Sequence, residues 1–216
     1  MLVKNIQRSL AALYETPVAH CVSDFLVTDA RVAAALEAPA QPRHNAERLL
    51  LQQTDDSLDI TLFIDAAVLD ALDDHDPFTS LHSHNLNHFM IALEGVSHFH
   101  YLVWNATHAR QVTQLELELQ AEVDKFVTAM RLFDEQGNGA APDEVHEALF
   151  TAVSFHAELD ADSDRRYREA NHYAGKYCRR LARRFPAQHR EPSFINELRR
   201  FYRLPQNQKI RAIETA

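Results

Sequence analysis

The sequence predicts one α+β domain that is predominantly α-helical, with a bundle of about five or six helices and one β-hairpin. Three observations support this fold class. Apolar residues recur at helical spacing over most of residues 81–203, period-two alternation is confined to residues 46–65, and a chain of 216 residues has the length of one ordinary domain. Residues 1–38 are expected to form an N-terminal helical arm.

The N-terminal part carries separate helix, loop and hairpin signals. A helix is expected over residues 3–14, and Asp29 predicts the start of a second, short helix because aspartate is favoured at helix N-caps. The proline-containing segment 38–42 indicates a loop. Apolar and polar residues alternate beside the turn-rich tetrapeptide 54–57, so a β-hairpin is expected over residues 46–65.

Helical segments follow the hairpin to the end of the chain. Thr113 and Glu116 have the spacing of a capping box, and Pro142 has the residue type favoured at the first position of a helix. The expected helices cover residues 66–72, 81–106, 113–134, 142–159, 163–185 and 193–202.

Composition excludes several classes of protein. The chain has four glycines, and the one close pair, Gly137 and Gly139, is not followed by the lysine of a phosphate-binding loop, which argues against nucleotide-binding motifs. The two cysteines lack CxxC spacing, so a disulfide framework is not expected. No stretch reaches the ~18 apolar residues of a membrane span, and the N-terminus lacks signal-peptide features. We therefore expect a cytoplasmic protein with no membrane partner.

Charge is distributed unevenly along the chain. Residues 1–160 contain 8 Lys/Arg and 25 Asp/Glu, a net −17, whereas residues 161–216 contain 14 and 6, a net +8. A basic segment can fold back onto an acidic body or contact an acidic partner. We favour the first interpretation because it requires no second molecule.

The central helical segment, residues 86–106, carries the main functional hypothesis. It is apolar on nearly every side, which is typical of a buried helix. Glu94 and His98 are four residues apart, so their side chains lie on one helix face, and Glu122 and His156 are expected to point inward from two other helices. Helical bundles build carboxylate–histidine metal sites in this way, and these ligands suit a divalent transition metal, namely Zn, Fe or Mn. We therefore predict a metal site at Glu94, His98, Glu122 and His156.

Two alternatives for these residues stay open. They could perform acid–base chemistry, because burial shifts their pKa values toward neutrality, or they could be hydrogen-bonded core residues. A di-iron bundle usually carries two Glu-x-x-His motifs. Here the Glu94/His98 spacing is four, and the one such motif, Glu169/His172, places His172 opposite the apolar face of its helix. The di-iron interpretation is therefore disfavoured.

A cationic helix face over residues 163–185 predicts a possible anion- or nucleic-acid-binding surface. Arg166 and His172 also have R-x5-H spacing, which resembles the motif of helical HEPN-type ribonucleases and implies RNA cleavage. The net charge of −9 argues against a nucleic-acid partner, which usually requires a basic protein. The candidate anion-binding residues are Arg165, Arg168, His172, Arg179 and Arg183.

Three function classes follow from these features. The first is a helical bundle with an interior carboxylate–histidine site for a metal ion or acid–base chemistry. The second is a non-catalytic regulatory or scaffold protein that acts through its surfaces, the hairpin edge included, as a homodimer or with another protein. The third is an RNA-binding or RNA-cleaving protein. We favour the first because it is tied to specific residues, although the sequence does not decide whether the protein is an enzyme.

Overall fold

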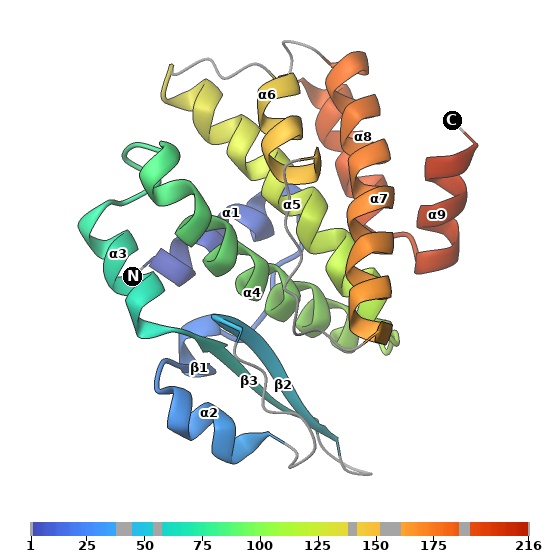
Figure 1. The fold of residues 1–216 in the computed structure, drawn as a ribbon. Helices are drawn as coiled ribbons and strands as arrows, with labels where there is room; N and C mark the ends of the chain where they lie inside the picture. The colour runs from blue at the N-terminus through green and yellow to red at the C-terminus, as the bar shows by residue number, and fades with distance from the viewer. Residues whose placement is uncertain are drawn as a thin grey trace.

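The computed structural model describes residues 2–37, 45–53, 58–137, 142–151, 161–185 and 191–215. These residues form a helical body with a small sheet and one short helix on one side of it (Figure 1). The expected mostly helical α+β class is confirmed. The elements are α1 (Leu2–Tyr14), β1 (Leu26–Val27), α2 (Ala30–Leu36), β2 (Glu47–Gln53), β3 (Leu58–Ile64), α3 (Ala66–Asp74), α4 (Ser83–Thr107), α5 (Gln114–Glu135), α6 (Pro142–His146), α7 (Ala161–Arg184), α8 (Pro192–Tyr202) and α9 (Gln206–Glu214).

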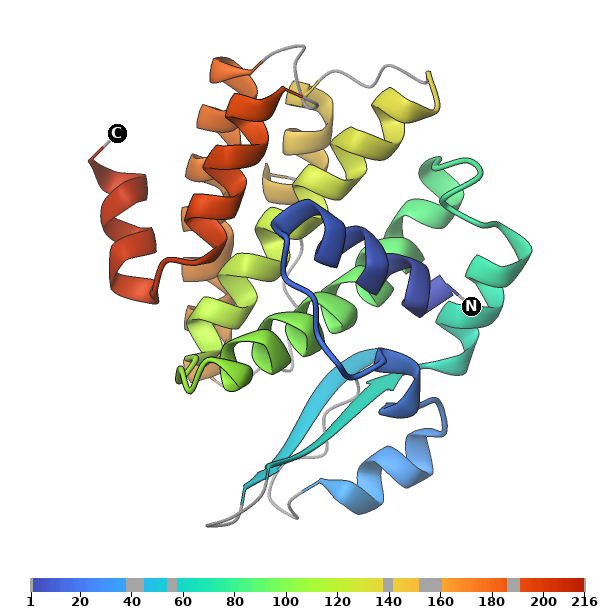
Figure 2. The same ribbon diagram turned by 180° about the vertical axis from the view of Figure 1, so that it is seen from behind.

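Helix α4 forms the centre of the fold, because its side chains are apolar on nearly every face and it therefore packs against neighbours all round. It contacts α1, α3, α5 and the strands β2 and β3. In Figure 2, α1 crosses α4 on the side facing the viewer. Phe89, Leu93, Val96 and Phe99 of α4 are completely buried. Within the described ranges, no helix has both the length and the apolar character needed to cross a membrane.

The sheet has three strands in the order β1-β3-β2, whereas the sequence predicted a hairpin alone. Strands β2 and β3 form the expected antiparallel pair, with Leu49 opposite Leu62. The additional strand β1 is only two residues long and runs parallel to β3. So short a strand has no alternation pattern to reveal it, and only its tertiary pairing defines it. The turn 54–57 and the loop 38–42 lie outside the described residues.

Capping residues fixed several helix starts as the sequence predicted. The Asp29 side chain accepts a hydrogen bond from the backbone N–H of Arg31 at the start of α2. Thr113 accepts one from the backbone N–H of Glu116 at the start of α5. Caps of this kind depend on residues within one turn, so they are visible in the sequence.

The described residues contain nine α-helices, one more than the eight helical segments expected along the chain, so the expected bundle of five or six helices is only roughly matched. The last one, α9, begins directly after Pro205 and lies beyond the last expected helix, residues 193–202. Lys209 of α9 extends into the core, where it is fully buried and donates a hydrogen bond to Gln120 of α5. Burial lowers the pKa of Lys209 to about 7. A lysine anchor gives no apolar periodicity, which explains why this helix was missed.

The segment expected to be one α-helix over residues 142–159 is only partly α-helical in the residues that the structure describes. Helix α6 begins at Pro142 as expected, but the α-helical hydrogen bonding ends at His146 and continues as a π-helical turn, Glu147–Thr151. The His146 ring forms a 2.8 Å hydrogen bond to the backbone carbonyl oxygen of Gly175 in α7. Residues 152–160 lie outside the described ranges.

Candidate metal centre

A cluster of two carboxylates and one imidazole lies where the sheet meets the central helix. Glu94 and His98 lie one turn apart on α4, and Glu47 is the first residue of β2. Each residue offers one ligand atom, and these three atoms all lie within 4.8 Å of one another. The cluster could therefore hold a metal ion. His98 is buried, and the Glu47 and Glu94 side chains are 12% and 22% exposed.

Gly95 allows β2 to approach α4 closely enough for this contact. A Cβ atom at position 95 would lie 2.7 Å from Cγ of Glu47 and 2.9 Å from Cδ1 of Leu62. Both distances are shorter than carbon atoms tolerate. The glycine in the middle of the helix is thus required by the neighbouring sheet.

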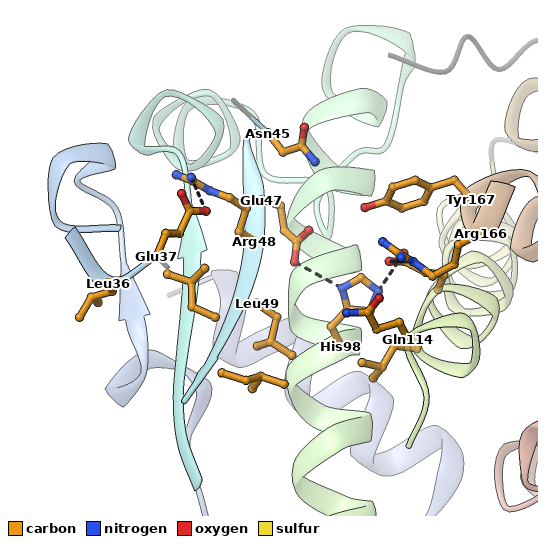
Figure 3. Close-up of a pocket in the computed structure, with 14 residues that line it drawn as sticks. Leu36, Glu37, Asn45, Glu47, Arg48, Leu49, His98, Gln114, Arg166 and Tyr167 are labelled. Carbon is orange, nitrogen blue, oxygen red and sulfur yellow. Dashed lines mark hydrogen bonds and ion pairs between the residues drawn. The ribbon is translucent and has the colours of Figure 1, made fainter. Parts of the chain in front are cut away.

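The His98 ring lies between two carboxylates (Figure 3). Its Nδ1 atom is 3.4 Å from Oε1 of Glu47, and its Nε2 atom is 3.4 Å from Oε2 of Glu118 on α5. Burial alone would lower the pKa of His98, but the carboxylates of Glu118 and Glu47 outweigh burial and raise the pKa well above its usual value. The His98 ring is therefore protonated when it binds no ion, and each of its two N–H groups faces one carboxylate.

Lys125 joins one further carboxylate, that of Glu122, to Glu94 of the cluster. Its Nζ atom is 2.8 Å from Oε2 of Glu94 and 2.6 Å from Oε1 of Glu122. Burial works against the charged form of Lys125, but Glu122 and Glu94 raise its pKa above the usual lysine value, so the ammonium stays charged. For Glu94, the attraction of Lys125 and His98 exceeds the effect of burial, and the pKa of Glu94 is lowered.

The cluster has more carboxylates than permanent cations. Four glutamates, Glu47, Glu94, Glu118 and Glu122, are linked by the contacts above, and the Arg166 Nε atom lies 3.8 Å from Oε1 of Glu118. Among the described residues, Arg166 and Lys125 balance two of the four carboxylates. Protonated His98 balances a third, and two carboxylate charges are left when His98 is a neutral ligand. Burial of uncompensated charge is costly. One divalent cation would supply the missing charge.

A cavity of about 460 Å³ gives access to the cluster. Glu47, His98 and Glu118 line it at one end, and Arg166 and Tyr167 of α7 line its wall. In Figure 3 the Tyr167 hydroxyl points toward Glu47. Burial and the carboxylates of Glu118, Glu94 and Glu47 raise the pKa of Tyr167, so this hydroxyl keeps its proton and can donate a hydrogen bond. The cavity is large enough for a small molecule.

Three of the four residues predicted as metal ligands lie in this region. Glu94 and His98 belong to the three-residue cluster, and Glu122 is joined to Glu94 through Lys125. His156 lies outside the described residues. Glu47 and Glu118 were not predicted.

Two sequence signals could have identified the missed glutamates. Glu47 shares its strand face with Leu49 and Leu51, because successive side chains of a strand alternate between the two faces. Glu118 and Glu122 are separated by four residues on α5, the same spacing as Glu94 and His98 on α4. Neither signal shows that the strand and the two helices meet, which depends on the tertiary fold.

Other polar residues of α4 and α5 form a separate network. The Tyr101 hydroxyl donates a 2.5 Å hydrogen bond to Oε1 of Glu116, which also pairs with Arg110. The side-chain amide of Asn105 donates to the Tyr101 carbonyl oxygen at 2.7 Å. These buried groups therefore satisfy one another within the protein.

The candidate anion-binding residues lie on the outer face of α7. All five are exposed: Arg165, Arg168, His172, Arg179 and Arg183. Arg165 pairs with Asp162 and Arg168 pairs with Asp164 on the same helix. Arg166, by contrast, faces Glu118, so the two residues of the R-x5-H motif do not lie on the same side of α7.

The chain matches no protein-family model, no curated protein and no solved structure.

Proposed function

We propose that this protein binds one divalent transition-metal ion through Glu47, Glu94 and His98. The observation that carries the proposal is the convergence of their three ligand atoms within 4.8 Å. Carboxylate oxygen and imidazole nitrogen together suit Zn, Fe or Mn. When His98 is a neutral ligand, Arg166 and Lys125 leave two of the four carboxylate charges unbalanced, which supports an ion of charge +2.

The proposed site leaves room for chemistry on a second ligand. Three protein ligands leave at least one coordination position for water or a substrate, as in catalytic zinc sites. Because Glu47 and His98 line the cavity, a small molecule could reach that position. Arg166 and Tyr167 would contact it from the cavity wall.

Glu118 is positioned to orient His98 as a metal ligand. A histidine bound to a metal usually donates its other ring N–H to a carboxylate. Here Nδ1 faces Glu47, and Nε2 faces Glu118. With Nδ1 on the ion, Nε2–H would donate to Glu118 and fix the ring.

Metal titration of untagged protein tests the proposal. We expect about one equivalent of Mn²⁺ or Zn²⁺ by calorimetry, and a Kd at least tenfold weaker in E47Q and H98Q, because each removes one of three ligands. E37Q is the matched control, since Glu37 lines the same cavity but pairs with Arg48. Binding of less than a tenth of an equivalent by the wild-type protein would contradict metal binding and leave acid–base chemistry at His98 as the function of the cluster.

A second candidate function is association through the sheet side of the molecule. Four large hydrophobic residues are exposed among the described residues, and all lie in α2 or the β2–β3 pair: Val32, Leu36, Leu51 and Leu58. Exposed apolar residues gathered in one region often mark an interface. We propose a homodimer as the occupant, because β2 is an edge strand of the sheet that the described residues form, and an edge strand can pair with its own copy.

A further inference from the structure

Lys125 holds a position that an ion could hold. Its ammonium lies between Oε2 of Glu94 and Oε1 of Glu122, at 2.8 and 2.6 Å, and its side chain is 11% exposed. Glu94 also belongs to the cluster with Glu47 and His98. One carboxylate thus serves both the proposed metal site and the lysine.

The carboxylates around the proposed metal site and Lys125 resemble the ligand set of a centre that holds two cations. Dinuclear sites in helical bundles hold two ions with glutamates from several helices, and such ions lie about 3.5–4 Å apart. Here the carboxylates come from α4, α5 and β2, and Glu94 stands between two cation positions. The second position is filled by an ammonium that belongs to the chain.

We infer that Glu94 and Glu122 form a second cation position that Lys125 occupies, so that the site takes a single metal ion. This inference rests on the proposed function, because Glu94 is shared between the two positions. Charge balance supports it. The four carboxylates are neutralised by Arg166, Lys125 and one divalent ion when His98 is neutral as a ligand, whereas a second divalent ion beside Lys125 would leave an excess of positive charge.

Lys125 would also fix the geometry of the site. A glutamate side chain has several rotamers, and the hydrogen bond from Nζ holds the Glu94 carboxylate in one of them. Lys125 and Glu122 are three residues apart on α5, so one helix face presents both groups to α4. The lysine is therefore a positioning residue for Glu94.

Removal of the ammonium tests the inference. K125M keeps an unbranched apolar stem but leaves Glu94 and Glu122 without their shared cation. We expect K125M to bind two equivalents of Mn²⁺, where the wild-type protein binds one, measured by titration with electron paramagnetic resonance. Spin coupling between the two Mn²⁺ ions is the expected signature of their short separation. The double variant E122Q/K125M lacks the second carboxylate and should return to one equivalent.

Each outcome decides the inference. If folded K125M binds no more Mn²⁺ than the wild-type protein, the inference is overturned, and it is also overturned if the additional equivalent persists in E122Q/K125M. If K125M folds only with Mn²⁺ present, the inference is supported, because the ion then replaces the ammonium. If K125M fails to fold with or without Mn²⁺, the inference is wrong.

The same measurements separate this inference from the proposed function. A wild-type protein that binds no Mn²⁺, together with K125M that binds one ion and loses it in E122Q/K125M, would remove the Glu47–Glu94–His98 site and keep the second position. One equivalent of Mn²⁺ in both the wild-type protein and K125M would keep the Glu47–Glu94–His98 site and remove the second cation position.

Discussion

His98 and His100 lie two residues apart on α4 and have opposite electrostatic environments. His98 faces the carboxylates of Glu47 and Glu118, which hold its pKa above the usual value. His100 lies on another side of the helix, is completely buried, and has the Thr16 hydroxyl 3.0 Å from its Nε2 atom. Burial therefore lowers the pKa of His100 to about 4. Identical side chains on one helix thus hold different protonation states because their neighbours differ.

The lowered pKa of His100 predicts acid sensitivity. Between pH 6.5 and 4 the unfolded state binds a proton at this position and the folded state does not, so the free energy of unfolding falls as pH decreases through this window. Over the whole window, the pKa difference at His100 lowers the free energy of unfolding by about 3 kcal/mol. We expect H100N, whose amide does not titrate, to lose this part of the acid dependence. Urea unfolding of both proteins from pH 4 to 7 measures the difference, and parallel stability curves would show the prediction to be wrong.

At the residue scale, the sequence identified the part of the site that lies on one helix. Glu94 and His98 were predicted because helical spacing alone places them on one face. Glu122 was predicted from the apolar stripe of its own helix. Glu47 was missed because its relevance depends on β2 lying against Gly95, a contact between segments far apart in the sequence.

At the element scale, Gly95 determines how closely the sheet approaches α4. G95A would place a methyl group 2.7 Å from Glu47 Cγ and 2.9 Å from Leu62 Cδ1, so β2 and β3 must move away. We expect a loss of about 1–3 kcal/mol in the free energy of unfolding, although alanine favours the helix by about 1 kcal/mol. The affinity for Mn²⁺ should fall by at least tenfold, because Glu47 moves with the strand.

The control for G95A is G175A. Gly175 is also a buried helix glycine, but an added Cβ would lie 3.4 Å from Phe150, which requires only a slight adjustment. Chemical denaturation should therefore find G175A within about 1 kcal/mol of the wild-type protein. Equal stability and equal Mn²⁺ affinity for the two variants would contradict the role assigned to Gly95.

Elements defined by local signals were predicted, and elements defined by distant partners were not. The caps at Asp29 and Thr113 act within one helical turn and gave correct helix starts. Strand β1 exists because it pairs with β3, and α9 is held by Lys209 in the core. Such contacts join residues far apart in sequence, so periodicity does not contain them.

At the scale of the whole molecule, the exposed apolar residues of α2 and the hairpin predict self-association. Light scattering after size-exclusion chromatography should give a mass near twice the 24.7 kDa of the chain at micromolar concentration. L51K/L58K should shift the protein to the monomer, because charge at an interface opposes pairing. R183E is the control and should leave the mass unchanged, because Arg183 is exposed near the C-terminal end of α7 and does not line the cavity shared by Leu36 and Leu51. A wild-type monomer at every concentration would exclude the dimer.

The uneven charge of the chain is partly balanced within the fold. Arg199 of the basic C-terminal part pairs with Glu15, and Arg166 pairs with Glu118. On α7, Arg165 and Arg168 pair with aspartates of their own helix, whereas Arg180 donates a hydrogen bond to the Ala212 carbonyl oxygen. The basic segment therefore contacts the acidic body at particular points and keeps an exposed cationic face.

The position of Glu47 on β2 has a consequence for how the molecule opens. An ion bound by Glu47, Glu94 and His98 would be a reversible cross-link between the sheet and the central helix. Its binding free energy would add to the cost of separating these two layers, by an amount that grows with the logarithm of ion concentration. Amide hydrogen exchange in β2 and β3 would then slow as free metal increases, while exchange in helices remote from the ion stays constant, and the sheet would report the metal supply of its surroundings.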